Sequence, residues 1–315
     1  MAYRDELKIR IGTLVGGAND PAEYIRQILP HGFESFSITF WQTSEGVDWE
    51  KMAWEVNEAL DGSEAVISSL AVFGNPLESG DKDKTTLRAW EEAIDNARLF
   101  GADIVGGFTG RIRDVPLHES MPRFKEVWSE LGKRAADKGV RIAFENCAMG
   151  GTWERGDWNI AHTPVCWEMM FHEVPLENLG LEWEPCHQLT YLIDPMPQLR
   201  EWAPRIVHMH GKDASVHWDT VKRYGIYHSM APDIALPGQA TPVPPFSYHR
   251  MPGMGDSNWK DIITELRLVG FEGSIDIEGW HDPVYRNELE MTGQVHALNY
   301  LKECRGGSFV PNPQS

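Results

Sequence analysis

Eight short apolar runs alternate with amphipathic stretches along this 315-residue chain, and few folds accommodate that order. Strands that are separated by helices pair in parallel through right-handed crossovers. Eight such units close naturally into an α/β fold, the (β/α)8 TIM barrel. The predicted strands cover residues 9–17, 34–41, 65–74, 103–110, 141–147, 179–187, 205–213 and 273–279.

The stretches between the strands read as helices, for example residues 84–100, 120–138 and 257–269. A glycine, Gly101, Gly139 or Gly270, stands where each of these helices should end, as expected for a left-handed C-cap. A doubly wound open sheet is the alternative fold. It is disfavoured because no GxGxxG motif follows the first strand.

The whole of residues 1–305 is predicted to form one barrel domain, with a flexible tail over 306–315. Two connections are long for this fold: residues 148–163 after the fifth strand and 214–255 after the seventh. Both leave the C-terminal end of a strand, which is the catalytic face of such barrels. We therefore expect residues 214–255 to form a lid or a partner-binding insertion.

Composition narrows the function classes. Hydrophobic residues at 42% and charged residues at 24% are typical of a soluble globular enzyme, and the net charge of −18 disfavours nucleic acid as a partner. No apolar run reaches the roughly 18 residues that cross a bilayer, and the first residues lack a signal segment. These features predict a cytoplasmic protein without a membrane partner. The cysteines form no CxxC pair and are predicted to be free thiols: Cys147, Cys166, Cys186 and Cys304.

Acidic and imidazole side chains stand at the ends of the last four predicted strands. These ends converge on one mouth in a barrel. Three carboxylates that are buried together raise one another's pKa, unless a cation neutralises them. We predict one divalent cation, with Mn²⁺ as the first choice for oxygen and nitrogen ligands and Mg²⁺ or Co²⁺ as alternatives. Its predicted ligands are Glu145, Glu184, His210 and Glu278.

Three further polar residues share strand parity with these ligands and should face inward at a deeper level. His208 is interpreted as a packed core histidine. Glu182 is interpreted as a supporting group or a member of a buried polar pair, and Asp276 stands in the same relation to Glu278.

Four motifs of this chain, together with Glu278, resemble the xylose-isomerase-like barrel superfamily: FEN (144–146), GLxxExxH (180–187), VHxHxKD (207–213) and RxPGxGDxxW (250–259). That superfamily includes sugar isomerases and epimerases, inosose dehydratases and hydroxypyruvate isomerases, and the resemblance spans residues 9–301. The second ligand is often Asp in such enzymes, whereas this chain has Glu184.

A narrower set of motifs is similar to the large subunit of bacterial C-glycoside deglycosidases: GLEWEPCHQ, HGKDA, DIEGxHDP and GGTWxxGDWNIA. Those enzymes cleave the sugar–aryl carbon bond of 3-oxo-glycosides and work with a small second subunit. This resemblance implies a sugar or glycoside substrate, an oligomer and the same kind of partner.

The resemblance also implies catalytic roles. A metal polarises the substrate carbonyl while a neighbouring group removes a proton. Glu145 and Glu278 would each serve as ligand and base. His187 and Lys212 would bind hydroxyls or assist proton transfer.

Other residues are candidates for binding substrate. Trp153 and Trp158 could stack on a flat aglycone or a sugar ring, or could anchor their loop. Trp280 could wall the pocket, and Arg250 could bind a phosphate or a sugar hydroxyl. A loop histidine could protonate the leaving group, and the sequence does not choose among His217, His228, His249 and His281.

Four functions follow from this reading. The first is a metal-dependent carbon–carbon lyase that removes a proton next to the carbonyl and eliminates the aglycone. The second is a metal-dependent keto-sugar isomerase or epimerase with the same site. An endonuclease on abasic DNA is disfavoured by the net charge of −18, and a non-catalytic subunit with a structural metal would have no open coordination position.

Overall fold

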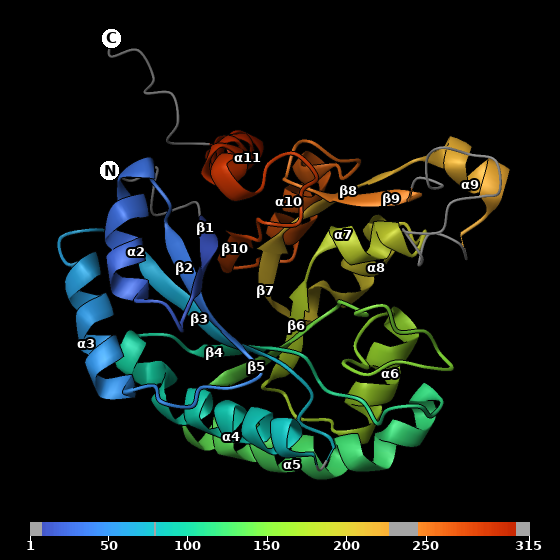
Figure 1. The fold of residues 1–315 in the computed structure, drawn as a ribbon, viewed down its shortest axis with the longest axis horizontal. Coiled ribbons are helices and arrows are strands. Elements are labelled where there is room, and N and C mark those ends of the chain that lie inside the picture. The colour runs from blue at the N-terminus through green and yellow to red at the C-terminus, as the bar shows by residue number, and fades with distance from the viewer. Residues whose placement is uncertain (1–7, 79, 227–244, 307–315) are drawn as a thin grey trace.

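The computed structural model describes residues 8–78, 80–226 and 245–306. Eight parallel strands close a barrel in the order β1-β10-β7-β6-β5-β4-β3-β2, which confirms the predicted TIM barrel and excludes the open sheet (Figure 1). The barrel strands are β1 (Ile9–Gly16), β2 (Ser35–Trp41), β3 (Val66–Phe73), β4 (Ile104–Gly107), β5 (Arg141–Glu145), β6 (Leu179–Trp183), β7 (Ile206–Gly211) and β10 (Gly273–Ile277).

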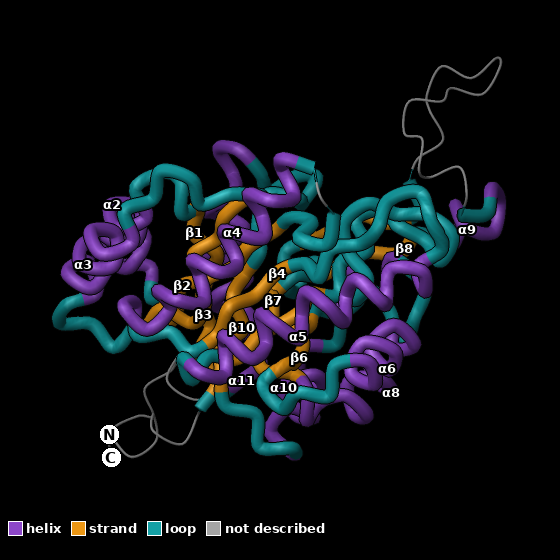
Figure 2. The backbone as a smooth tube through the Cα atoms, turned by 90° about the horizontal axis from the view of Figure 1, so that it is seen from below, coloured by secondary structure: helices purple, strands orange, loops and turns teal. Residues whose placement is uncertain are grey.

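Helices surround the strands, as Figure 2 shows with the strands at the centre. The α-helices are α2 (Pro21–Ile28), α3 (Trp49–Leu60), α4 (Asp81–Asn96), α5 (Met121–Asp137), α6 (Pro164–Glu173), α7 (Pro185–Thr190), α8 (Pro195–Trp202), α9 (Trp218–Tyr224), α10 (Trp259–Leu268) and α11 (Glu290–Arg305). Short 3₁₀ turns cover Leu29–His31, Ala97–Phe100, Leu117–Ser120, Ala203–Arg205 and Asn287–Leu289. Gly101, Gly139 and Gly270 have φ of 75°, 66° and 74°, which confirms the predicted helix ends.

The sixth strand is shorter than predicted. We expected it to run to His187, but it ends at Trp183 and α7 begins at Pro185. Proline has no N–H for a sheet and is well suited to the first turn of a helix. His187 therefore lies on α7 and not on a strand.

The apolar core lies between the barrel and its helices, whereas the inside of the barrel holds buried polar groups. Two glycines make room for the carboxylates among them. A Cβ atom on Gly106 would stand 2.5 Å from Glu182 Oε1, and one on Gly12 would stand 2.2 Å from Asp276 Oδ1. The polar layer inside the barrel therefore depends on strand positions without side chains.

The second long connection carries an antiparallel hairpin, β8 (Asp213–Val216) and β9 (Ser247–Arg250), with α9 beyond it. Figure 1 shows the hairpin and α9 projecting to one side of the barrel. The role of residues 214–255 as a lid or a partner-binding insertion stays a prediction. Residues 227–244, including His228, and the predicted tail from 307 onward lie outside the described residues.

All four cysteines are free thiols, as predicted. Within the described ranges, none of the helices has the length and apolar character needed to cross a membrane.

Candidate metal centre

The four predicted metal ligands converge. Glu145 ends β5, Glu184 caps α7 directly after β6, His210 lies in β7, and Glu278 follows β10 directly. Each of the four offers a ligand atom, and these atoms all lie within 4.8 Å of one another. All four side chains are buried. Three oxygen donors and one nitrogen donor at this separation fit a hard or borderline divalent cation.

The two ring nitrogens of His210 face different groups. Nδ1 lies 3.1 Å from Glu145 Oε1 and 3.4 Å from Glu278 Oε2, so it points into the group of ligands. Nε2 lies 3.4 Å from Glu182 Oε1. The two atoms lack hydrogen-bond geometry, but the negative charge of a carboxylate at that distance favours the tautomer with its proton on Nε2, which leaves Nδ1 free to coordinate.

Several buried oxygens of the site have no hydrogen-bond partner among the described residues. They are Oε2 of Glu184 and Oε2 of Glu278; Glu184 Oε1 also lacks hydrogen-bond geometry, although His187 Nε2 lies 2.5 Å from it. An unsatisfied buried acceptor is destabilising, and charged acceptors are more so. A cation bound between these oxygens would satisfy them, so the residues present fit the predicted metal.

Burial and charged neighbours shift the pKa values of two carboxylates of the site, Glu145 and Glu278. Burial, together with the nearby Glu278 and Glu184, raises the pKa of Glu145 to about 7, although His210 acts in the opposite direction. Burial alone would also raise the pKa of Glu278, but Lys212 and His210 hold it well below its ordinary value. Lys212 Nζ lies 2.6 Å from Glu278 Oε1 and 3.9 Å from Glu184 Oε1. This ammonium is therefore built into the metal centre.

A buried polar chain lies beneath the ligands. His208 bonds through Nδ1 to Glu182 and through Nε2 to Asp276, both at 2.7 Å. Ser35 and Ser68 donate to the two oxygens of Asp276 at 2.5 Å each. The predicted deeper position of these residues is confirmed, and His208 is bonded on both sides instead of merely packed.

Replacing Glu182 by glutamine is expected to weaken cation binding by about 10–100-fold. The amide keeps the size of the carboxylate but no longer holds the proton on His210 Nε2, so the nitrogen that faces the cation is less available. Competition titration with a fluorescent chelator would measure the change. The matched variant Glu92→Gln alters a carboxylate on α4 that bonds Ser44, outside the barrel, and should leave the affinity unchanged. Equal affinities in both variants would contradict this role.

Two asparagines that the sequence analysis did not single out hold the ligands in place. Asn146 accepts a hydrogen bond from Glu184 N and donates to Glu184 O, both at 2.8 Å. Asn159 donates to Glu145 O at 2.7 Å. The position of Asn146 next to Glu145 in the FEN motif was the available signal.

The predicted substrate residues occupy different surroundings. His187 is buried, with Nε2 2.5 Å from Glu184 Oε1, so it lies beside the metal centre. Trp280 is 41% exposed and has φ of 38°, a strained conformation at the end of β10. Arg250 Nε donates to Asp282 Oδ2 at 2.9 Å, so its guanidinium is already engaged within the fold.

The aromatic residues of the first long loop pack in separate pairs. Trp153 stacks on His118, with ring centroids 6.4 Å apart. Trp158 lies 5.4 Å from Trp41 at the end of β2, a partner that the sequence analysis missed. Trp41 is more than half exposed, so the pair could still receive a flat group.

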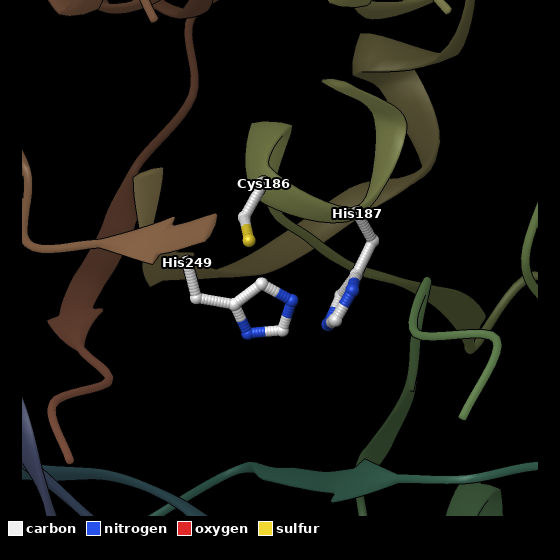
Figure 3. A group of neighbouring side chains, drawn as sticks. All are labelled: Cys186, His187 and His249. Atoms are coloured by element: carbon white, nitrogen blue, oxygen red, sulfur yellow. The ribbon is translucent and has the colours of Figure 1, made fainter. Parts of the chain in front are cut away.

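The candidate loop histidines also lie in different surroundings. His249 packs edge-on against His187 (Figure 3) and against His281, with centroids 5.2 and 5.7 Å apart. His281 Nε2 lies 3.3 Å from Glu278 Oε1. His217 packs against Tyr248 and is exposed. Of the three candidates among the described residues, the structure thus brings His249 and His281 to the candidate metal centre.

Comparison with known proteins finds two relatives by sequence and a solved structure of the same fold. The chain is 24% identical to the uncharacterized protein YfiH of Bacillus subtilis over 274 residues, 78% of this chain and 80% of YfiH. It is 24% identical to inosose dehydratase 1 of Bacillus cereus over 204 residues, 62% of this chain and 61% of that protein. The apo crystal structure of 3-keto-D-glucoside 4-epimerase, YcjR, from E. coli superposes with a TM-score of 0.66 at 15% identity, covering 94% of this chain and 100% of that chain.

A family model also matches most of the chain. Residues 25–304, from α2 into α11, match the family described as xylose isomerase-like TIM barrel. The closed barrel of eight parallel strands agrees with that description. The chain belongs to the xylose isomerase-like TIM barrel family.

Proposed function

We propose that this chain is a divalent-metal-dependent enzyme that acts on a carbonyl-bearing sugar, and specifically a lyase that releases the aglycone from 3-oxo-glycosides. The observation that carries the proposal is the convergence of Glu145, Glu184, His210 and Glu278 within 4.8 Å at one buried point. Burying so many carboxylates is costly for stability and has a clear use in metal-assisted chemistry.

Mn²⁺ is the proposed cation, with Mg²⁺ and Co²⁺ as alternatives, because the donors are oxygen and imidazole nitrogen without a thiolate. When bound, such an ion supplies Lewis-acid polarisation of the substrate carbonyl. The remaining chemistry belongs to side chains of this chain.

Glu145 or Glu278 is the proposed base. Each carboxylate belongs to the metal centre and could remove the proton from the carbon next to the carbonyl. The electron pair of that C–H bond moves toward the carbonyl oxygen. Lys212, 2.6 Å from Glu278, is the proposed group whose positive charge stabilises the developing negative charge.

Elimination completes the lyase reaction. The enolate electrons return to form a carbon–carbon double bond, and the bond to the aglycone breaks with its electron pair. The departing carbon or oxygen then needs a proton. His249 and His281 lie beside the candidate metal centre, but burial and the charge of Lys212 lower the pKa of both rings. The proposed donor is therefore whichever of the two receives the proton that the base has removed. His187, against Glu184, would hold a sugar hydroxyl.

The aglycone would occupy the aromatic side of the mouth. The aromatic side chains proposed to stack on the aglycone are Trp158 with Trp41, Trp153 and Trp280. Arg250 would bind substrate only if its bond to Asp282 broke. The β8–β9 hairpin is the proposed contact surface for a small second subunit, as the deglycosidase resemblance implies.

The alternative is a keto-sugar isomerase or epimerase. One feature favours it: Glu145 and Glu278 approach His210 Nδ1 from different strands, at 3.1 and 3.4 Å. Two carboxylates on two sides of a substrate can remove a proton from one face and return it to the other. The names of the similar proteins support both chemistries, since one is a dehydratase of inosose and one an epimerase of a 3-keto-glucoside.

One assay separates the two. The chain is stripped with a chelator, restored with Mn²⁺, and given 3-oxo-glucosides with C- and O-linked aryl groups and free ketoses in deuterated water, with and without a small second subunit. Release of free aglycone that requires the cation supports the lyase. Deuterium incorporation with a new epimer and no aglycone supports the alternative, and no exchange on any substrate would overturn both.

A further inference from the structure

A buried guanidinium, that of Arg111, holds the first long loop, residues 148–163. Arg111 follows β4, and its side chain is 0% exposed. Nη1 donates to Thr152 O at 2.5 Å, and Nη2 donates to Trp153 O at 3.0 Å and to Val115 O at 3.2 Å. Among the described residues, the hydrogen-bond partners of this guanidinium are thus backbone carbonyls and not carboxylates.

The loop closes tightly on this side chain. A Cβ atom on Gly156 would stand 2.6 Å from Arg111 Nη1 and 3.1 Å from the Cα atom of Gly151. Tyr191, at the end of α7, donates to Gly151 O at 2.8 Å. A buried charge without a counter-ion is costly for folding. An apolar side chain could fill the same space at less cost, whereas only a guanidinium offers this fork of donors.

Asn75, which follows β3, joins Arg111 to a second part of the loop. Its Oδ1 accepts a hydrogen bond from Arg111 N at 3.1 Å, and its Nδ2 donates to Arg111 O at 2.6 Å and to Asp157 O at 2.7 Å. This close approach requires Gly110, which has φ of 80° and at which a Cβ atom would stand 2.5 Å from Asn75 Oδ1. Asn75 is 1% exposed, so its amide is available only to these partners.

These bonds fix the backbone beside both tryptophans of the loop. The peptide groups before and after Trp153 bond to the guanidinium, and the one before Trp158 bonds to the asparagine. After Trp158, Asn159 donates to Glu145 O at 2.7 Å and accepts from Thr109 N at 3.1 Å. The bond to Thr109 does not involve the guanidinium. Loosening the loop around Trp153 should therefore leave Glu145 in place.

We propose that Asn75 and Arg111 are positioning residues that give this chain a preference for flat aryl aglycones, because they fix Trp153 and Trp158 before the substrate binds. The inference rests on the proposed function, which assigns these two tryptophans to the aglycone. An aromatic surface that is already ordered binds a ring without the entropic cost of ordering a loop. A loosened loop would weaken the contact with the aryl group and leave the sugar contacts at the metal centre unchanged.

Trypsin reports on the loop without any substrate. Arg155 is exposed within the loop, so the rate of cleavage after it measures how often the loop opens. Arg111→Lys keeps the charge and loses the fork of donors, so we expect this cleavage to be at least about 10-fold faster than in the wild-type chain. Arg205→Lys is the matched control and should be cleaved at the wild-type rate. Arg205 also donates to two carbonyls, those of Leu176 and Leu179, but it precedes β7 at the opposite end of the barrel.

Equilibrium binding tests the preference for aryl groups. Calorimetry on the Mn²⁺-loaded full chain measures the Kd of 4-nitrophenyl and methyl 3-oxo-glucoside, with Glu145→Gln in every chain so that the probes are not consumed. The chain with the unchanged loop should bind the aryl probe about 5–10-fold more tightly than the methyl probe. Adding Arg111→Lys or Asn75→Ala should abolish this difference and leave the Kd of the methyl probe within about twofold. Adding Arg205→Lys should preserve the difference.

The outcomes separate a positioning role from a merely structural one. Equal Kd values of the two probes with the unchanged loop, equal weakening of both probes by Arg111→Lys, or an unchanged rate of trypsin cleavage would each overturn the inference. Release of free aglycone by the wild-type chain, together with an aryl preference that survives Arg111→Lys, would leave the proposed function standing without it. An aryl preference that depends on Arg111, in a chain that releases no aglycone, would do the reverse.

Discussion

Glu145→Gln is expected to lower turnover by at least about 1,000-fold while the barrel stays folded. Glutamine has nearly the same size as glutamate, so the buried pocket keeps its packing. It cannot take up the substrate proton, and it removes one of the three carboxylates that face the cation. Turnover would be measured on whichever 3-oxo-glucoside or ketose the wild-type chain converts, at saturating Mn²⁺.

An assay at saturating Mn²⁺ separates the two explanations for the loss of turnover. If Glu145 acted only as a ligand, excess Mn²⁺ would restore most of the turnover; if it moves the proton, the loss remains when elemental analysis shows the ion bound. Glu34→Gln is the matched control, because Glu34 pairs with Arg305 at the opposite mouth of the same barrel. That variant should lose stability and keep its turnover. A Glu145→Gln chain with more than a tenth of wild-type turnover would contradict the catalytic assignment.

The grouping of the four candidate metal ligands was predictable because the fold brings the ends of neighbouring strands together by rule. Once the alternation of strands and helices predicts a barrel, the carboxyl ends of neighbouring strands must meet at one mouth. Glu145, His210 and Glu278 could therefore be grouped without knowledge of any loop. Including Glu184 in this group required only that the sixth strand end near Pro185. An error of a few residues in the predicted end of that strand therefore did not matter.

The surroundings of the centre were not predictable in the same way. The pairing of Trp158 with Trp41 and of Arg250 with Asp282 depends on how long loops fold back over the mouth, and no strand register determines this. The contact of His249 with His187 needs the hairpin as well as α7. Sequence reasoning named His249 among four histidines but had no physical ground to prefer it.

Lys212→Met is expected to separate cation binding from catalysis. Methionine matches the buried lysine side chain as far as its ε carbon and removes the ammonium that lies 2.6 Å from Glu278. Without a cation, the variant leaves Glu278 without this partner, which should cost about 3 kcal/mol of folding stability. With a cation bound, that carboxylate is neutralised again. Added Mn²⁺ should therefore raise the melting temperature of Lys212→Met more than that of the wild-type chain.

Turnover should then fall without a loss of cation affinity. Lys212 and a divalent ion compete for the charge of Glu278 and Glu184, so removing the lysine should leave Mn²⁺ affinity equal or tighter by calorimetry. Turnover should still fall about 100–1,000-fold, because the ammonium no longer stabilises negative charge on the substrate oxygen. Lys222→Met, an exposed lysine on α9, is the matched control and should change neither quantity. If Lys212→Met lost its Mn²⁺ and recovered turnover in excess cation, Lys212 would be a supporting group for the ion instead of a group that acts on the substrate.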